Sequence, residues 1–182
     1  MVKKNFKAKL NLACGNDDLR PILNYIYFNN GNAVATNAHI LIISPLRLHG
    51  FELEEIQRLE GYCISAELFK TILKFHRVYV GSEGVILCKS KTGDSFEVKL
   101  DLMVKHGVFT NYEAVIPKSR REINEIGLNL NLLALAKDLI VTEISGNAKI
   151  NLFGKDKAVV IESNEILMSG QTLLIMPLNL NP

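Results

Sequence analysis

The first part of the chain carries the hydrophobic pattern of β-strands. Apolar and polar residues alternate from Phe6 to Cys14, which predicts a strand with one exposed face. Apolar runs follow at 22–28 and 33–36, and the turn Asn29-Asn30-Gly31-Asn32 lies between them. Because Asn and Gly tolerate the positive φ of tight turns, this stretch predicts a β-hairpin.

A short polar corner follows the hairpin. Thr36-Asn37-Ala38-His39 interrupts the apolar pattern before Ile40 to Ile43 resume it as a strand, which ends near Pro45. The strands on either side hold such a corner in place, while its loop leaves the polar side chains exposed. The position is therefore suited to binding a ligand. No nucleophile, carboxylate pair or second metal ligand is spaced to work with His39. We therefore expect this side chain to stabilise the corner rather than to catalyse a reaction.

The next stretch contains one clear helical pattern. Residues 46–60 fit either a loose helix or an exposed connector. A short strand is predicted at 62–64, and a helix then runs from an N-cap at Ser65 to Phe75. Three strands are predicted after it, at 78–80, 85–88 and 96–102.

The same order then begins again. The pattern predicts a strand at 125–128, a helix at 132–140 capped by Asn129 or Asn131, and strands at 148–153, 158–162 and 171–178. One helix and three strands thus recur at a spacing of roughly 60 residues, which is too long and too imperfect for a solenoid. The repeat indicates stacked αβ half-domains, with the helices on a common face of the sheets.

Composition narrows the functional classes. With 182 residues, of which 48% are hydrophobic, the chain can form one large domain or two small ones. A net charge of +2 is too small to indicate a nucleic-acid binder by itself, and the lysines near the amino end are more typical of a solvated edge. The residues form no glycine-rich phosphate loop, metal-ligand spacing or nucleophile elbow. We therefore expect neither an enzyme nor a bound cofactor or metal.

The cysteines and the hydropathy of the chain indicate the cellular compartment. The three cysteines lie far apart without metal-ligand spacing, which favours a reduced, cytoplasmic protein. No apolar run approaches the ~20 residues of a membrane span, and the first residues lack the apolar segment of a signal peptide. The sequence therefore predicts a protein without a membrane partner.

Four segments resemble the bacterial sliding clamps, the β subunit of DNA polymerase III. Residues 18–41, which contain Ala-Thr-Asn-Ala-His, are similar to the start of the clamp's middle domain, whose corner usually reads Ala-Thr-Asp-Gly-His. Residues 108–117 resemble the Phe-Pro-Asp-Tyr segment that leads out of that domain, and 125–129 with 174–178 resemble the last half of the third domain. The resemblance implies an α+β, DNA-clamp-like fold, shortened relative to a complete clamp. It implies a clamp-type domain at 1–118, with a reduced first helix, and a carboxyl-terminal half-domain at 119–182.

The resemblance also implies an apolar groove that captures short peptides from polymerase or repair proteins. Without the resemblance, the leucines of this set are better explained as ordinary core residues; with it, groove and core are about equally favoured. The sequence departs from the family at Asn37-Ala38, where Asp-Gly is usual, at Ile40, where arginine is usual, and at Asn179, where a basic residue is common. The matching positions are Arg20, Leu23, Thr36, Ala38, His39, Leu41, Pro117, Asn129, Leu132, Leu174, Ile175, Met176, Pro177, Leu178 and Asn179.

Clamps bind duplex DNA through lysines and arginines on helices, without reading the bases. The positions expected to face DNA are Lys70, Lys74, Arg77 and Lys137. The sequence thus predicts a non-enzymatic, clamp-like protein that associates with duplex DNA and tethers replication or repair enzymes. A ring needs more half-domains than one chain supplies, so this function predicts a homo-oligomer. The alternative is an adaptor without a ring, which binds clamp-interacting peptides but does not encircle DNA.

Overall fold

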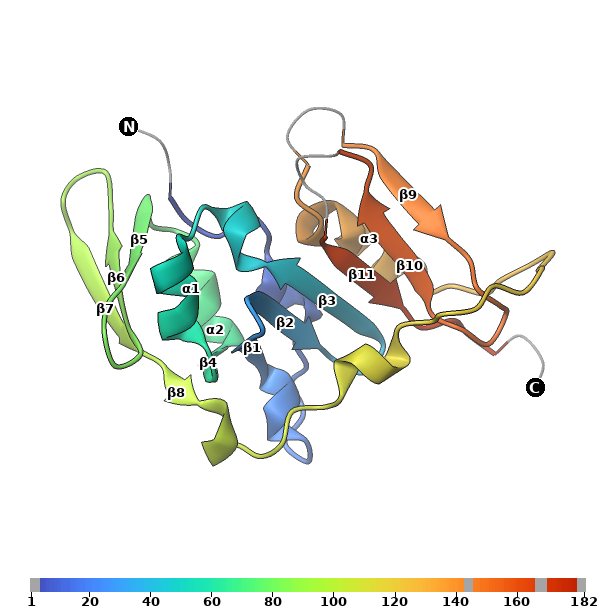
Figure 1. Ribbon diagram of the computed structural model, residues 1–182, viewed down its shortest axis with the longest axis horizontal. Helices are drawn as coiled ribbons and strands as arrows, with labels where there is room; N and C mark the ends of the chain where they lie inside the picture. The colour runs from blue at the N-terminus through green and yellow to red at the C-terminus, as the bar shows by residue number, and fades with distance from the viewer. Residues whose placement is uncertain (1–3, 143–145, 166–169, 180–182) are drawn as a thin grey trace.

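The computed structural model describes residues 4–142, 146–165 and 170–179 (Figure 1). Within these ranges the α-helices are α1 (Leu53–Leu59), α2 (Ala66–Ile72) and α3 (Leu130–Leu139). The strands are β1 (Tyr25–Asn29), β2 (Asn32–Thr36), β3 (Ile40–Pro45), β4 (Tyr62–Ser65), β5 (Arg77–Val80), β6 (Val85–Lys89), β7 (Ser95–Lys99), β8 (Asp101–Leu102), β9 (Ala148–Asn151), β10 (Val159–Ser163) and β11 (Thr172–Ile175). The 3₁₀ turns are η1 (Leu10–Ala13), η2 (Pro21–Asn24), η3 (Leu46–His49), η4 (Met103–Lys105) and η5 (Tyr112–Val115).

Most strands belong to one antiparallel sheet of eight, in the order β8-β4-β1-β2-β3-β11-β10-β9. β5, β6 and β7 form a second, three-stranded sheet. The junction between β3 and β11 joins the early and late parts of the chain, with Ile40 opposite Ile175 and Ile43 opposite Thr172. Figure 1 shows these two strands side by side at the centre of the molecule. The α+β architecture is therefore as predicted, while the division at residue 118 stays a prediction.

The predicted hairpin is confirmed. β1 and β2 pair in register from Tyr27 opposite Val34 to Asn29 opposite Asn32. The two turn residues, Asn30 and Gly31, have φ values of 50° and 73°. This is the left-handed backbone that a two-residue hairpin turn requires, and it explains why Asn-Gly occurs there.

The predicted strand at 6–14 is wrong, although its alternation is real. Phe6, Ala8 and Leu10 are buried as a strand-like pattern requires, but the segment runs into the 3₁₀ turn η1. β1 is already paired on both sides, by β2 and β4, so the sheet interior offers no free edge there. The segment instead packs between the sheet and helices α2 and α3, and the Lys9 N–H donates to the Asp138 carbonyl at 2.9 Å.

Three further expectations need correction. The strand expected at 125–128 is reduced to one bridge, between Gly127 and Leu178. The strand expected at 96–102 breaks at the buried Leu100, and its two pieces, β7 and β8, belong to different sheets. The helix expected to reach Phe75 ends at Ile72 and continues as a turn. In each case tertiary pairing or packing overrides the local pattern.

Local capping signals are accurate. The Ser65 hydroxyl accepts from the Leu68 N–H at 3.4 Å at the start of α2, and the Asn129 side chain accepts from the Asn131 N–H at 2.9 Å at the start of α3. The uncertain stretch 46–60 forms η3 and then α1, which starts with a capping box between Glu52 and Glu55. These caps satisfy N–H groups that the first helical turn leaves unpaired.

The large sheet is covered differently on its two faces. On one face, Phe28, Ile42 and Leu173 belong to a core completed by α2, α3 and η1. On the other face, a smaller cluster that includes Val34, Leu41 and Leu174 is covered by Tyr112, Phe109 and Ile116. These last three residues belong to residues 103–117, which we call the crossover segment. In Figure 1 it is the yellow-green stretch that leads from β8 past the ends of β1 to β3.

Candidate functional site

The polar corner at 36–39 is held by its own side chains. The Thr36 hydroxyl donates to the Ile40 carbonyl at 2.7 Å and accepts from the Ala38 N–H at 3.1 Å. The Asn37 side-chain oxygen accepts from the N–H groups of His39 and Ile40, both at 3.0 Å. These bonds explain the polar residue types at 36 and 37. They fix a loop whose tip, Ala38 and His39, is exposed.

The carboxyl-terminal strand lies directly beside this corner. Leu174 in β11 is opposite Leu41 in β3, and the Met176 N–H donates to the His39 carbonyl at 2.9 Å. Leu174 is buried, whereas Met176 is 39% exposed. Residues more than 130 positions apart therefore form one continuous apolar surface at the end of β3.

The crossover segment forms the third wall. Tyr112 is buried, and its hydroxyl accepts a hydrogen bond of 3.1 Å from the Asn29 side chain. Phe109 packs on the ring of Tyr27, with the centroids 5.1 Å apart. These two aromatic anchors hold the segment against β1, so that Val115 faces the corner.

The three walls enclose a mostly apolar cavity of about 310 Å³, which we call the groove. It brings together seven of the residues expected there: Arg20, Leu23, Thr36, Ala38, Leu41, Leu174 and Met176. The residues that we did not predict are Ile22, Ile40, Thr110, Tyr112 and Val115. Thr110, Tyr112 and Val115 lie within the clamp-like segment 108–117, so that motif contained a signal for them.

The other expected groove residues lie elsewhere. Pro177, Leu178 and Asn179 line a neighbouring hollow of about 380 Å³, and Pro117 lines another of about 500 Å³; Met176 borders both. Ile175 is fully buried in the core beneath the helices, and Leu132 packs against that core from α3. Asn129 caps α3, and His39 contributes its backbone carbonyl beside the groove. Met176 is thus the residue that joins the three hollows.

The arrangement of strands, helices and crossover segment matches known structures, although sequence comparisons find no counterpart. No protein-family model matches the sequence, and no curated protein matches it. The DNA polymerase III β subunit of Borrelia burgdorferi superposes with a TM-score of 0.68 and 14% identity, over 100% of this chain and 64% of the other. The β subunit of Thermotoga maritima gives 0.61 and 11%, over 95% and 63%. The Helicobacter pylori β clamp gives 0.57 and 11%, over 98% and 66%.

This chain has the sliding-clamp fold. The fold that the sequence motifs implied is therefore confirmed, and the chain spans about 64% of the length of the Borrelia subunit. The backbone of the corner at 36–39 also agrees with the clamp motif. Ala38 stands where the clamp motif has glycine, and its φ of 74° is in the left-handed region that glycine adopts without steric cost.

In this sliding-clamp fold, the lysines expected to face DNA lie over the helical side of the sheet. Lys70 and Lys74 are exposed on and just after α2, whose buried residues Phe69 and Ile72 pack in the core. Lys137 is exposed on α3, which covers the same face. The adjacent Asp138 is paired with the Lys9 ammonium at 2.8 Å.

Arg77 does not belong to this set of lysines. It lies on β5, in the three-stranded sheet, and its guanidinium donates to the Tyr79 hydroxyl at 3.3 Å. The neighbouring Val78 is buried in the core, and successive side chains of a strand point to opposite faces. The Arg77 side chain is therefore on the outer face of the small sheet, together with Tyr79.

Hydrogen bonding and burial shift the pKa of several side chains. At the edge of the groove, the Arg20 guanidinium pairs with the Asp17 carboxylate at 2.8 Å, and this hydrogen bond holds the pKa of Asp17 below its usual value. Burial raises the pKa of the Cys14 and Cys63 thiols to about 12, so they stay protonated and unreactive at neutral pH. Within the described ranges, no cluster of three His, Cys, Asp or Glu residues could hold a metal ion. None of the described helices is long and apolar enough for a membrane span.

Proposed function

We propose that this protein is a non-enzymatic, clamp-type tether, which captures short apolar peptide segments in the groove and associates with duplex DNA. The observation that carries the proposal is the pairing of β11 with β3, which places Leu174 and Met176 against the corner. The predicted motifs lie far apart in sequence, and this pairing brings them together.

The groove has the composition of a peptide site. Its lining is mainly apolar, with Thr36, Thr110 and Arg20 as the polar groups that can orient a ligand. Met176 lies where the hollows meet, and its flexible, polarisable side chain can adapt to different partners. Polymerases and repair proteins that carry clamp-binding motifs are the partner class that the fold favours.

Met176→Ala is expected to weaken peptide binding by about tenfold, because it removes an apolar contact at the junction of the hollows. The measurement is fluorescence anisotropy with a labelled peptide that carries a clamp-binding motif. Ile150→Ala on the edge strand β9 is the matched control, since Ile150 is also apolar and is 54% exposed. Equal affinities for the wild type and both variants would exclude the groove as the peptide site.

The double variant Lys70→Glu/Lys74→Glu is expected to lower the affinity for duplex DNA and to reduce the slope of log K against log salt by about 2. Both lysines are exposed on the helical side, where phosphate contacts would release counterions. The measurement is anisotropy of a labelled duplex between about 50 and 200 mM salt. Lys91→Glu/Lys99→Glu is the control with the same charge change, since Lys91 is exposed in the turn between β6 and β7 and Lys99 is exposed on β7. If the two double variants lose affinity equally, the helical face is not the DNA site.

The second candidate is an adaptor that binds peptides but forms no ring around DNA. The observation that favours it is that all residues lining the groove come from one chain, so peptide binding needs no assembly of several chains. The mass of the protein in solution, measured with and without DNA, separates the two candidates. An oligomer with salt-dependent DNA affinity supports the ring-forming tether. A monomer that binds the peptide but not DNA supports the adaptor.

A further inference from the structure

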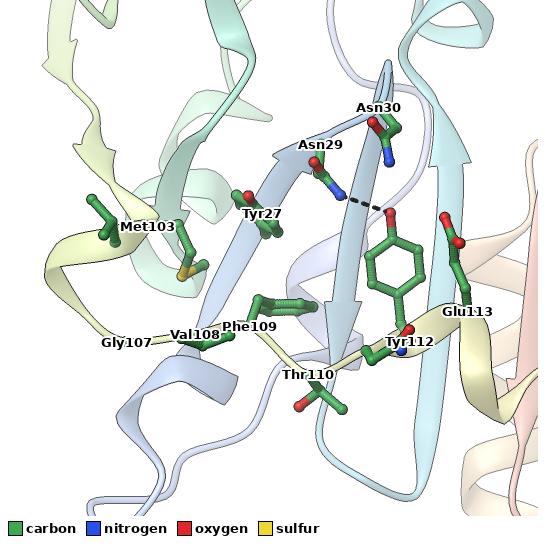
Figure 2. A pocket seen from close by; sticks show the side chains of 12 residues that line it. Tyr27, Asn29, Asn30, Met103, Gly107, Val108, Phe109, Thr110, Tyr112 and Glu113 are labelled. Carbon is green, nitrogen blue, oxygen red and sulfur yellow. Dashed lines mark hydrogen bonds between the residues drawn. The ribbon is translucent and has the colours of Figure 1, made fainter.

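A second cavity, of about 450 Å³, lies across the crossover segment from the groove. Figure 2 shows it between the outer face of β1 and the stretch that leads from Met103 to Glu113. Ten of its twelve lining residues lie outside the groove, and the second cavity has a different chemical character. The groove is mainly apolar, whereas this cavity combines aromatic rings with amide and carboxylate oxygens.

Three aromatic side chains line the cavity in a fixed arrangement. Phe109 packs on Tyr27 at a centroid distance of 5.1 Å and meets Tyr112 edge-on at 6.3 Å. The Asn29 side chain donates to the Tyr112 hydroxyl, the bond drawn as a dashed line in Figure 2. Because the rings are packed and hydrogen-bonded, they present their surfaces to a ligand without further ordering.

The polar groups of the cavity favour a cation. Among the described residues that line it there is no Lys, Arg or His, whereas Glu113 contributes a carboxylate. A second carboxylate, that of Glu60, lies beside it and accepts from the N–H of the lining residue Asn30 at 2.9 Å. Burial, and to a smaller extent the Glu60 carboxylate, raise the pKa of Tyr27.

The cavity and the groove share one wall. Thr110 and Tyr112 line both, so the two cavities adjoin at the crossover segment. An apolar site thus lies next to a site with a carboxylate in its lining.

We propose that the second cavity binds a lysine or arginine side chain on one flank of the peptide that occupies the groove. This inference rests on the proposed function and adds a charge requirement to it. The cation would lie against the aromatic lining of the cavity and pair with the Glu113 carboxylate.

The test compares four labelled peptides with the same apolar segment. One has neutral flanks, one an arginine on the amino side, one an arginine on the carboxyl side, and one a glutamate on each side. One of the two arginine peptides is expected to bind about three- to tenfold more tightly than the neutral one, as an exposed ion pair and a cation–π contact would give. The glutamate peptide is expected to bind more weakly than the neutral one.

Glu113→Gln is expected to abolish the gain from arginine while leaving the affinity of the neutral peptide unchanged. Glu113 is exposed, so the substitution should not disturb folding. Glu122→Gln, also exposed and outside the cavity, is the matched control and should retain the gain. If neither arginine peptide gains affinity, or if both variants lose the gain equally, the proposal is overturned.

A further measurement distinguishes failure of this inference from failure of the proposed function. N-acetyl-arginine methylamide, a probe without the apolar segment, should shift the amide resonances of Gly107 and Asn111 in the wild type but not in Glu113→Gln. If the neutral peptide does not bind, the proposed function fails whatever this probe shows. If the neutral peptide binds but the probe shifts neither resonance, the charged cavity alone is refuted.

Discussion

Gln171→Ala is expected to lower the free energy of unfolding by about 3 kcal/mol, because it leaves several buried polar groups without partners. The Gln171 amide nitrogen donates to the Ser44 hydroxyl at 2.9 Å and to the Leu139 carbonyl at 2.8 Å. Its oxygen accepts from the Val141 N–H at 2.8 Å. Gln171 is 1% exposed, so water cannot replace these bonds. The side chain therefore connects β3, β11 and the end of α3.

Urea unfolding followed by circular dichroism measures this change. Thr172→Ala is the matched control, since Thr172 is the next residue and is only partly buried. We expect the control to cost less than about 1 kcal/mol. Peptide binding provides a second readout, because loosening β11 should displace Leu174 and Met176 from the groove. If Gln171→Ala lowers the free energy of unfolding by less than about 1 kcal/mol, the hydrogen bonds of Gln171 do not hold β3, β11 and the end of α3 together.

Acidification from about pH 7.5 to pH 5 is expected to lower the free energy of unfolding by about 2 kcal/mol through His49 alone. His49 is 1% exposed, and burial, with a smaller effect of the Lys7 charge, lowers its pKa to about 3. Its Nδ1 accepts from the Lys7 N–H at 2.9 Å, so the proton is on Nε2, which faces the Ser44 hydroxyl at 2.9 Å. A second proton would have to lie on Nδ1, against an N–H donor.

The direction of the effect follows from the two pKa values. In the unfolded chain the pKa of His49 returns to about 6.5, so the unfolded state binds a proton that the folded state excludes. The stability contributed by neutral His49 is therefore fully present above about pH 6.5 and is lost progressively as the pH falls toward 3. The measurement is urea unfolding at several pH values in this range.

His49→Gln should flatten this pH dependence, whatever it does to the stability at neutral pH. His39→Gln is the control, because His39 is exposed at the corner and its substitution should leave the slope unchanged. If the slope of the wild type between about pH 7.5 and 5 equals that of His49→Gln, the buried imidazole is not the cause.

The features predicted correctly from sequence depend on neighbouring residues. The Asn30-Gly31 turn, the Ser65 cap and the Asn129 cap each satisfy a local backbone requirement, so a few adjacent residues suffice to identify them. The order of helix and strands in each half follows from hydrophobic periodicity for the same reason.

The errors concern pairing between distant segments. The alternation at 6–14 correctly marks buried side chains, but both neighbours of β1 are already in place, so this stretch becomes a 3₁₀ turn under the helices. Arg77 follows the first helix in sequence, yet β5 carries it to the outer face of the small sheet. In both cases the side-chain pattern is compatible with two backbone arrangements, and only the surrounding strands select one.

The sequence by itself determined the class of fold, the positions of most strands and caps, and about half of the groove residues. Only the tertiary structure decided that β11 pairs with β3, that the crossover segment closes the groove, and that a second cavity lies beside it. The physical reason is the range of the interactions. Turns and caps are satisfied within a few residues, whereas the groove requires backbone hydrogen bonds between strands that are about 130 positions apart.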